Sequence, residues 1–413
     1  MIAILSDIDT PRLRYALGFL LEGYSFELFR GSESIPPGFK VLSYGLECKD
    51  AMIHFPCMNF PWWRDETRDT NQFRKAVERL ESFGGFDLFG YAFYLLARCD
   101  EYTPEHFDEW GRFQSSGCIQ KQWEGVDAAY LDEWRFQLLQ ALGISETRIP
   151  KRQLTVDIDS PYAFKYKTIL SQWGGFCRDV VRFKWDWVSK RLQVILGEPD
   201  PYDTYEFLKK ICQNEQMTLK YFVLCAERSD LDRGMHIHQT AGWQRLFHSI
   251  RDAQWGWHPS VLGHDIDGLY ESEMNRLEQL GCKRIQSARF HYLKQELPIS
   301  SSRLVGLGVE EDYTMGFADT VGYRAGTSRS FLWYDWNKSQ LSNLRLVPFW
   351  GMDVALKNYL QLKPEEAIAK VAAAKQYARL YHCDWRMVWH NESVSDWSEW
   401  KGWGVVLKQF VER

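Results

Sequence analysis

From Gln153 onward, short apolar runs alternate with amphipathic stretches. The runs are rich in β-branched and aromatic residues and predict strands at 153–159, 218–225, 254–258, 284–291, 311–316, 343–349 and 385–390. The stretches between them have helical spacing and predict helices at 203–214, 240–253, 269–281, 300–307 and 364–382. Repeated β-α units predict a parallel sheet with right-handed crossovers. About seven strands in about 260 residues predict a (β/α) barrel, closed or incomplete.

The pattern before Gln153 is less regular and predicts a smaller mixed α/β domain at residues 1–150, ahead of the barrel domain at 151–413. Its predicted elements are an amphipathic helix within 10–30, short strands at 26–29 and 40–44, and helices at 71–82, 84–98 and 127–142. We expect this first domain to dock on the barrel and to contribute little to its chemistry. For the charged, aromatic loop at 100–113 we expect a structural turn, with a binding role as the alternative. Residues 160–200 predict a helical excursion that the β-α pattern does not place.

Composition excludes several classes of function. The 413 residues carry a net charge of −5, so no basic face is implied and nucleic-acid binding has no support. The nine cysteines stand singly, without a C-x-x-C pair, which is typical of reduced thiols and predicts a cytoplasmic protein. No signal peptide is predicted, and no apolar run is long enough for a transmembrane segment. The oligomeric state stays open.

Two carboxylates end the first strand of the alternating region. Asp157 and Asp159 are two residues apart in Leu154-Thr155-Val156-Asp157-Ile158-Asp159-Ser160-Pro161, so in a strand they point to the same face. One carboxylate of such a pair can bind a metal while the other takes a proton from water on that metal. A loop that caps a following helix with Asp159 and Ser160 is the alternative.

Polar residues also follow the later strands, and in a parallel sheet all these strand ends share one rim. Asp and neutral His are good ligands for a borderline divalent metal, so the pattern predicts a metal site there. The candidates at the strand ends are Asp157, Asp159, His258, Arg289, His291, Asp312, Tyr313, Arg324 and His390.

These motifs resemble those of the polysaccharide deacetylase family, metal-dependent carbohydrate esterases with a (β/α) barrel. The family's first motif, T-F-D-D or T-x-D-x-D, supplies a base aspartate and a metal aspartate, and Thr155-Val156-Asp157-Ile158-Asp159 matches the second form. His258-Pro259-Ser260 resembles the histidine motif, and Arg289-Phe290-His291-Tyr292 falls where the family has an arginine beside the base. Val388-Trp389-His390-Asn391 matches the last motif, which carries the general acid.

Nearly the whole chain resembles a branch of uncharacterised deacetylase-like proteins with an extra N-terminal domain. Besides the H-P-S and R-x-H-Y-L motifs, two stretches carry this closer match: Phe86-Asp87 to Glu101-Tyr102, and Asp312-Tyr313-Thr314-Met315-Gly316 to Gly322-Tyr323-Arg324-Ala325-Gly326-Thr327.

One position departs from the family pattern. The family has a second histidine four residues after the first, and here that position is Leu262. We expect His291 to replace it, because the neighbouring strand end should lie close to His258, and His264 is the alternative. His236 and His238 are spaced like strand ligands, but we expect them to lie in a loop.

The resemblance implies a metal-dependent hydrolase that removes acetyl groups from an N-acetylated sugar, glycan or glycan precursor. Asp159, His258 and His291 would hold a divalent metal, expected to be zinc. Asp157 would be the base and His390 the acid, with Arg289 or Arg324 orienting Asp157, and Asp312 is grouped with these catalytic candidates. The expected floor of a sugar site, for which plain packing is the alternative, comprises Tyr313, Tyr323, Trp389 and Trp397.

Two rival functions remain at this point. Leu262 favours a non-catalytic glycan-binding protein that kept the barrel and lost its full metal site. A different metal-dependent hydrolase on the same rim would differ only in its substrate.

Overall fold

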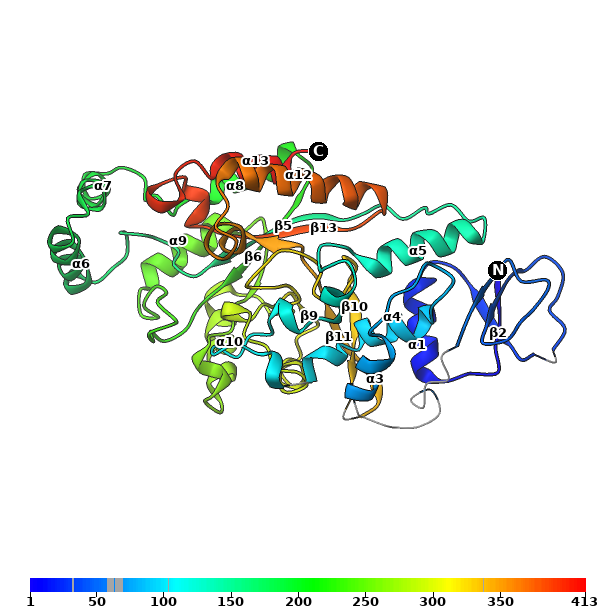
Figure 1. The fold of residues 1–413 in the computed structure, drawn as a ribbon. Helices are drawn as coiled ribbons and strands as arrows, with labels where there is room; N and C mark the ends of the chain where they lie inside the picture. Colours follow the sequence, from blue (N-terminus) through cyan, green and yellow to red (C-terminus); the bar gives the residue numbers. More distant parts are fainter. Residues whose placement is uncertain (32, 58–62, 64–69, 103, 337) are drawn as a thin grey trace.

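A mixed, mostly parallel sheet organises the computed structural model, which describes residues 1–31, 33–57, 63, 70–102, 104–336 and 338–413 (Figure 1). In these residues the sheet has nine strands in the order β10-β11-β9-β8-β7-β6-β5-β13-β12, and only β10 and β11 are antiparallel. The strands are β5 (Arg152–Ile158), β6 (Thr218–Val223), β7 (Gln254–Trp257), β8 (Ser287–Ala288), β9 (Glu311–Asp312), β10 (Phe331–Asp335), β11 (Gln340–Leu346), β12 (Gly351–Met352) and β13 (Trp385–His390).

Helices connect most of these strands, as the alternating pattern predicts. They are α8 (Tyr205–Asn214), α9 (Thr240–Ile250), α10 (Leu269–Gly281), α11 (Ile299–Gly306), α12 (Pro364–Leu380) and α13 (Gly404–Val411), with a short π-helix at Ala355–Tyr359. Because the strands from β5 to β9 run parallel, their carboxyl ends meet at one edge of the sheet.

The sheet is not closed, and the expected (β/α) barrel, closed or incomplete, is not confirmed. Its two outer strands, β10 and β12, do not pair with each other in the part of the chain that the structure describes. The outer side of β10 is instead covered by helices from the first 150 residues. Tyr15 donates a hydrogen bond from its hydroxyl to the carbonyl of Leu332, 2.6 Å away, and the ring of Phe93 packs 5.2 Å from that of Tyr334.

Residues 2–142 form a second, smaller α/β arrangement. Four parallel strands lie in the order β2-β1-β3-β4 among the described residues. The elements are β1 (Ile2–Leu5), α1 (Pro11–Leu20), β2 (Phe26–Phe29), β3 (Lys40–Tyr44), β4 (Ile53–Phe55), α3 (Thr70–Ala76), α4 (Leu88–Leu96) and α5 (Tyr130–Ala141). A single hydrophobic core runs from these elements into the large sheet, so the division at residue 150 stays a prediction.

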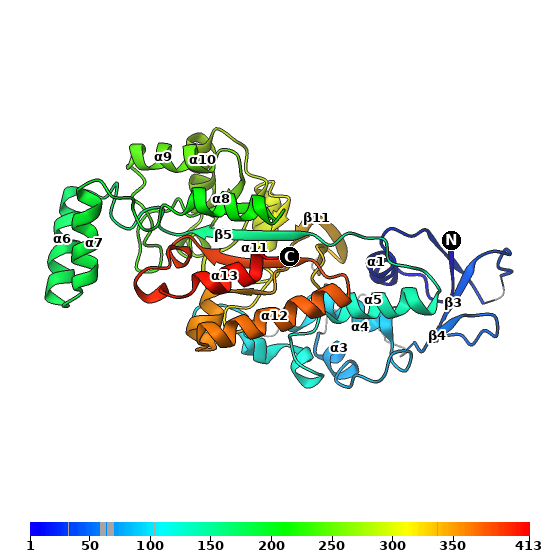
Figure 2. The same cartoon turned by 90° about the horizontal axis from the view of Figure 1, so that it is seen from above.

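Residues 160–200 contain two helices that lie apart from the sheet. These are α6 (Ile169–Val181) and α7 (Trp185–Ile195), which stand at the end of the molecule opposite the smaller sheet (Figures 1 and 2). Among the described residues, the structure has no helix of the length and apolarity needed to cross a membrane.

A buried charge cluster joins the two parts of the chain. Glu101 accepts hydrogen bonds from Arg324 at 2.8 and 2.6 Å and from Arg98 at 2.8 Å, and all three side chains are almost fully buried. Burial raises the pKa of Glu101, but the two guanidinium charges outweigh this and hold the pKa below its usual range. Each charge therefore depends on the others for compensation.

We expect Glu101→Gln to lower the free energy of unfolding by about 3–5 kcal/mol, because it leaves two buried guanidinium groups without their counter-charge. Denaturant unfolding followed by circular dichroism measures this loss. The exposed Glu109 offers a matched control, since Glu109→Gln should change stability by no more than about 0.5 kcal/mol. Equal stability of the two variants would contradict the role given to this cluster.

Candidate active site

Strand register brings the candidate side chains together. His390 at the end of β13 lies directly beside Asp157 of β5. On β7 and β8, Trp257 is paired with Ala288, and the next residues along these two strands are His258 and Arg289. Residues at matching positions of neighbouring parallel strands lie about one strand spacing apart. The side chains predicted at the rim are therefore neighbours in space because the sheet register places them there.

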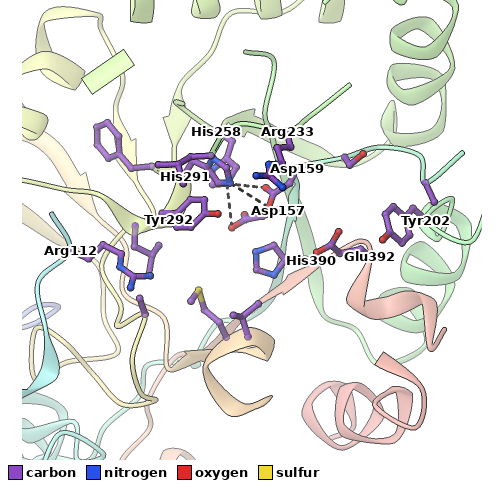
Figure 3. Close-up of a pocket in the computed structure, with 18 of the residues that line it drawn as sticks. Arg112, Asp157, Asp159, Tyr202, Arg233, His258, His291, Tyr292, His390 and Glu392 are labelled. Atoms are coloured by element: carbon purple, nitrogen blue, oxygen red, sulfur yellow. Dashed lines mark ion pairs between the residues drawn. The ribbon is translucent and has the colours of Figure 1, made fainter. Parts of the chain in front are cut away.

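Three side chains form a candidate metal centre. The Nε2 atom of His258 lies 3.3 Å from Asp159 Oδ1, and the Nε2 atom of His291 lies 3.5 Å from Asp159 Oδ2. One donor atom from each of the three residues lies within 4.8 Å of the other two. Figure 3 shows His258 and His291 directed toward Asp159 on the same side of the cavity. The third donor expected to replace Leu262 is thus in place beside the other two.

The hydrogen bonds of the two histidines leave a ring nitrogen free for a metal. His258 Nδ1 lies 2.5 Å from the carbonyl oxygen of Arg289, which can only accept, so Nδ1 carries the proton and Nε2 the lone pair. His291 Nδ1 likewise faces a carboxylate oxygen of Asp232 at 2.8 Å. Such contacts fix the tautomer and ring orientation of metal-binding histidines in proteins.

Asp159 supplies the negative charge of this centre. Its Oδ1 atom is buried and makes no hydrogen bond with the described residues, although it faces His258, while Oδ2 faces His291. Burial raises the pKa of Asp159, but the charge of His291 outweighs this and holds the pKa well below its usual range. Burial lowers the pKa of His291, and the charge of Asp159 raises it to about 9. A buried carboxylate oxygen without a donor, between two imidazole nitrogens, fits a divalent cation.

The side chain of Asp157 is held in place beside this centre. Arg289 donates hydrogen bonds to Asp157 Oδ1 at 2.6 Å, to Thr155 Oγ1 at 2.7 Å and to the carbonyl of Tyr313 at 3.1 Å. The other oxygen of Asp157, Oδ2, lies 3.8 Å from His258 Nε2. One oxygen is thus occupied by Arg289 while the other faces the metal ligands, as a base acting on a nearby water requires.

His390 lies next to Asp157, on the side of the aspartates away from His258 and His291 (Figure 3). Its Nδ1 lies 2.8 Å from Asp353 Oδ1, and its backbone N–H donates to Asp353 Oδ2 at 2.8 Å. Burial lowers the pKa of His390, but the charge and hydrogen bond of Asp353 outweigh this and hold the pKa well above its usual range. A protonated imidazole in this place can donate a proton to a leaving group.

These groups surround a cavity of about 430 Å³. Its polar and aromatic lining includes Arg112, Asp157, Asp159, Lys167, Trp187, Tyr202, Arg233, His258, His291, Tyr292, Tyr359, His390 and Glu392. Arg112 comes from the loop at 100–113, where it pairs with Asp108 at 2.6 Å and donates to the hydroxyl of Tyr359 at 2.8 Å. That loop, for which we expected a structural turn with a binding role as the alternative, therefore forms part of the cavity wall.

Several predicted site residues lie elsewhere. Arg324 is bound to Glu101 and makes no described contact with Asp157, so the structure corrects this alternative in favour of Arg289. Asp312 accepts from the side chain of Gln295 and from Thr314, outside the cavity lining, and Thr314 Oγ1 accepts from the backbone N–H of Phe290 at 3.1 Å. Asp312 thus supports the loop that carries His291.

The four aromatic residues expected to floor a sugar site also lie outside the cavity lining. Tyr323 and Trp389 are fully buried in the core, and Tyr313 packs against Phe222 with its ring centroid 5.0 Å away. Trp397 packs 4.7 Å from Trp187, which does line the cavity. These four side chains pack against other residues, and the aromatic side chains that line the cavity come from other places, such as Trp187 of α7 and Tyr359 at the end of the π-helix.

The alternative metal-binding histidines lie apart from the centre. His264 contacts the carboxylates of Asp265 and Glu296, at 3.1 and 3.8 Å. His236 and His238 are exposed in the loop before α9, as expected.

Two functional side chains escape prediction from the sequence. Asp353 follows a strand of only two residues, and Asp232 lies in an irregular loop, so neither has a periodic pattern around it. For Asp353 the sequence does contain a signal, because a polar residue directly after the short run Gly351-Met352 repeats the strand-end pattern of the other candidates.

Comparison with known proteins gives limited matches. A family model described as a family of unknown function, DUF7033, matches residues 2–145, and no curated protein matches the chain. A crystal structure of a protein assigned as a polysaccharide deacetylase from Mycobacterium smegmatis is similar with 13% identity and a TM-score of 0.41, over 65% of this chain and 85% of that chain. A mutant CE4 family pseudoenzyme with restored enzymatic activity is similar with 8% identity and a TM-score of 0.32, over 64% of each chain. The chemistry of the site therefore has to follow from its own side chains.

We expect Asp159→Ala and His258→Ala each to abolish stoichiometric binding of a divalent metal, because either change removes one of three donors. Elemental analysis of protein purified without chelator, and titration of the metal-free protein, measure this. His264→Ala is the matched control, since His264 lies outside the centre, and it should keep full metal content. If His264→Ala lost the metal and His258→Ala kept it, His264 would be the metal ligand in place of His258.

Proposed function

We propose that this chain is a metal-dependent hydrolase that removes acetyl groups from an N-acetylated sugar, glycan or glycan precursor. The observation that carries the proposal is that three groups of side chains with different chemical properties line one cavity. These are the Asp159–His258–His291 donor set, the carboxylate of Asp157 held by Arg289, and the imidazole of His390 held by Asp353. Amide hydrolysis needs an activated water, a base and an acid for the poor amine leaving group.

The donor set of two imidazole nitrogens and one carboxylate suits zinc. A zinc ion held there would lower the pKa of a bound water and polarise the acetamide carbonyl. Asp157 takes a proton through its Oδ2 atom, which faces the ligands, while Arg289 keeps the carboxylate in position. His390 then gives its Nε2 proton to the amine nitrogen, and Asp353 compensates the imidazolium charge until that transfer.

The lining of the cavity supports a sugar substrate. Its side walls carry Trp187, Tyr202, Tyr292 and Tyr359 together with Arg112 and Glu392. Aromatic rings offer flat apolar faces and, in tyrosine, a hydroxyl, a combination that suits the mixed surface of a sugar ring. Burial raises the pKa of Glu392 to about 7, with the charge of Asp159 adding to the effect, so this carboxyl can donate as well as accept near neutral pH.

The rival of a non-catalytic glycan-binding protein drew on Leu262. In this chain His291 offers a third donor from the neighbouring strand end, and both proton-transferring groups have charged partners that fix their orientation. A binding protein that uses only the cavity walls has no need of these buried pairs, which supports the enzymatic proposal.

Asp157→Asn and His390→Ala should each keep the metal and lower turnover of an N-acetyl substrate by roughly two to four orders of magnitude. On an activated acetate ester, whose leaving group needs little protonation, the His390→Ala defect should shrink while the Asp157→Asn defect persists. The measurements are the turnover of each variant on both substrates and its metal content by elemental analysis. Full amide hydrolysis by His390→Ala would remove that residue from the mechanism.

Asp353→Asn should move the alkaline limb of the kcat–pH profile to lower pH. Asp353 raises the pKa of His390, so the protonated acid persists to higher pH in the wild type and is lost earlier once the carboxylate charge is removed. The pH profile of the variant measures the shift, and Asp353→Glu should restore part of it. An unchanged alkaline limb with an overall loss of rate would assign Asp353 a purely structural role.

A further inference from the structure

The hairpin formed by α6, α7 and their connecting turn exposes an unusual share of the apolar surface. Nine of the 22 large apolar side chains that are exposed in the described residues fall within residues 169–196. They are Ile169, Leu170, Trp173, Val181, Phe183, Trp185, Leu192, Ile195 and Leu196, with exposures from 47% to 87%. Concentrations of this kind on a folded chain mark an interaction surface.

The polarity of the hairpin is inverted. Between its helices it buries an ion pair, with Arg191 Nη2 donating to Asp179 Oδ2 at 2.6 Å and both side chains at most 4% exposed. Gly175 is packed against this guanidinium, since a Cβ there would lie 2.8 Å from Arg191 Nη2. A water-facing helical pair normally buries apolar side chains and exposes charge. Here the charge lies inside and much of the apolar surface outside.

Charge accompanies this apolar surface. Residues 165–196 contain seven lysines and arginines and two aspartates, a net charge of +5 in a chain whose total is −5. At the tip, exposed apolar and basic residues alternate in Val181-Arg182-Phe183-Lys184-Trp185. Aromatic side chains with interleaved basic ones are typical of segments that lie in the headgroup region of an anionic bilayer.

A basic hollow lies at the base of the hairpin. It has a volume of about 220 Å³, and its lining includes Lys165, Lys167, Arg228 and Arg233. Lys167 and Arg233 also line the candidate active-site cavity, as does Trp187 of α7. Whatever surface the hairpin binds therefore lies close to the mouth of that cavity.

We infer that the α6–α7 hairpin docks the protein on an anionic lipid surface, with the apolar side chains in the interface and the basic ones against lipid headgroups. The charge argues against a second copy of the chain as the occupant. A two-fold contact would set two copies of residues 165–196, each of net charge +5, against each other. This inference does not depend on the reaction proposed for the cavity.

The test is co-sedimentation of the full chain with phosphatidylcholine vesicles, with and without phosphatidylglycerol. We expect binding to the anionic vesicles, weakened by salt, and little to the neutral ones. Each basic side chain near an anionic surface contributes roughly fivefold, so Arg182→Glu/Lys184→Glu should lower the affinity by more than about tenfold. The control with reversed charges elsewhere, Lys49→Glu/Lys401→Glu, should bind nearly as the wild type does.

Phe183→Ser/Trp185→Ser should also lose binding by about tenfold or more, because it removes inserted apolar surface. Leu380→Ser/Val405→Ser, at positions 57% and 48% exposed on α12 and α13, is the apolar control and should keep binding. Thermal unfolding by circular dichroism verifies that each variant is folded.

Absence of binding to anionic vesicles overturns the inference, and so does equal binding by the hairpin variants and the wild type. The alternative, that a second copy of the chain covers the hairpin, is tested by measuring the molar mass with light scattering after size-exclusion chromatography. A wild-type dimer that Phe183→Ser/Trp185→Ser converts to a monomer would show that the surface joins two copies instead.

Discussion

The ion pair between Asp157 and Arg289 is the contact on which the geometry of the cavity depends. Both side chains are at most 3% exposed, so neither charge can be compensated by water. A buried charge that loses its partner costs several kcal/mol, which makes the pair a condition for folding the rim as well as for its chemistry. Arg289 also donates to Thr155 and to the carbonyl of Tyr313, while its own carbonyl accepts from His258. Arg289 therefore orients the candidate base Asp157 and the candidate metal ligand His258, and it links the end of β8 to β5 and to the residue after β9.

A common rule governs the three histidines of the cavity. Each has its Nδ1 atom occupied by an oxygen acceptor, the carbonyl of Arg289 for His258 and carboxylates for His291 and His390. Each then presents Nε2 to the cavity. The Nε2 atoms of His258 and His291 lie 3.3 and 3.5 Å from Asp159, in the candidate metal centre. Burial lowers the pKa of His390, but the charge of the buried Asp353 outweighs this and holds the pKa well above its usual range.

Sequence patterns predict the longer parallel strands closely and the shorter strands less well. Strands β5, β6 and β13 have six or seven residues, enough for a period to be visible, and all were predicted nearly to their ends. The strands predicted at 284–291 and 311–316 are present as β8 and β9, but with two residues each, whereas β12, also of two residues, was not predicted. The extent of so short a strand is decided by its neighbours in the sheet and not by local pattern. Asp353 was missed for this reason. Sheet closure is likewise a tertiary property, set here by the helices that cover β10.

The choice between Arg289 and Arg324 shows the same limit within the site. Both follow strands or sit near strand ends, and order along the chain does not say which guanidinium faces Asp157. Glu101 determines the answer. This residue is more than 200 positions away from Arg324 in sequence, and its carboxylate binds the Arg324 guanidinium in the contact between the two parts of the chain. Long-range charge pairing of this kind has no local signal.

The origin of the third metal donor has a mechanical consequence. If both histidines came from one loop, a bound ion would join only that loop to Asp159 at the end of β5. Here His258 and His291 follow different strands, and the backbone at Tyr292 and Leu293 takes left-handed conformations, with φ of 60° and 56°, directly after the second histidine. An ion held by both would be a cross-link between β7 and β8 across a junction where the two strands share a single paired position. In this chain a metal bound at the rim would therefore also hold together β7 and β8, the neighbouring parallel strands with the fewest paired positions among the described residues.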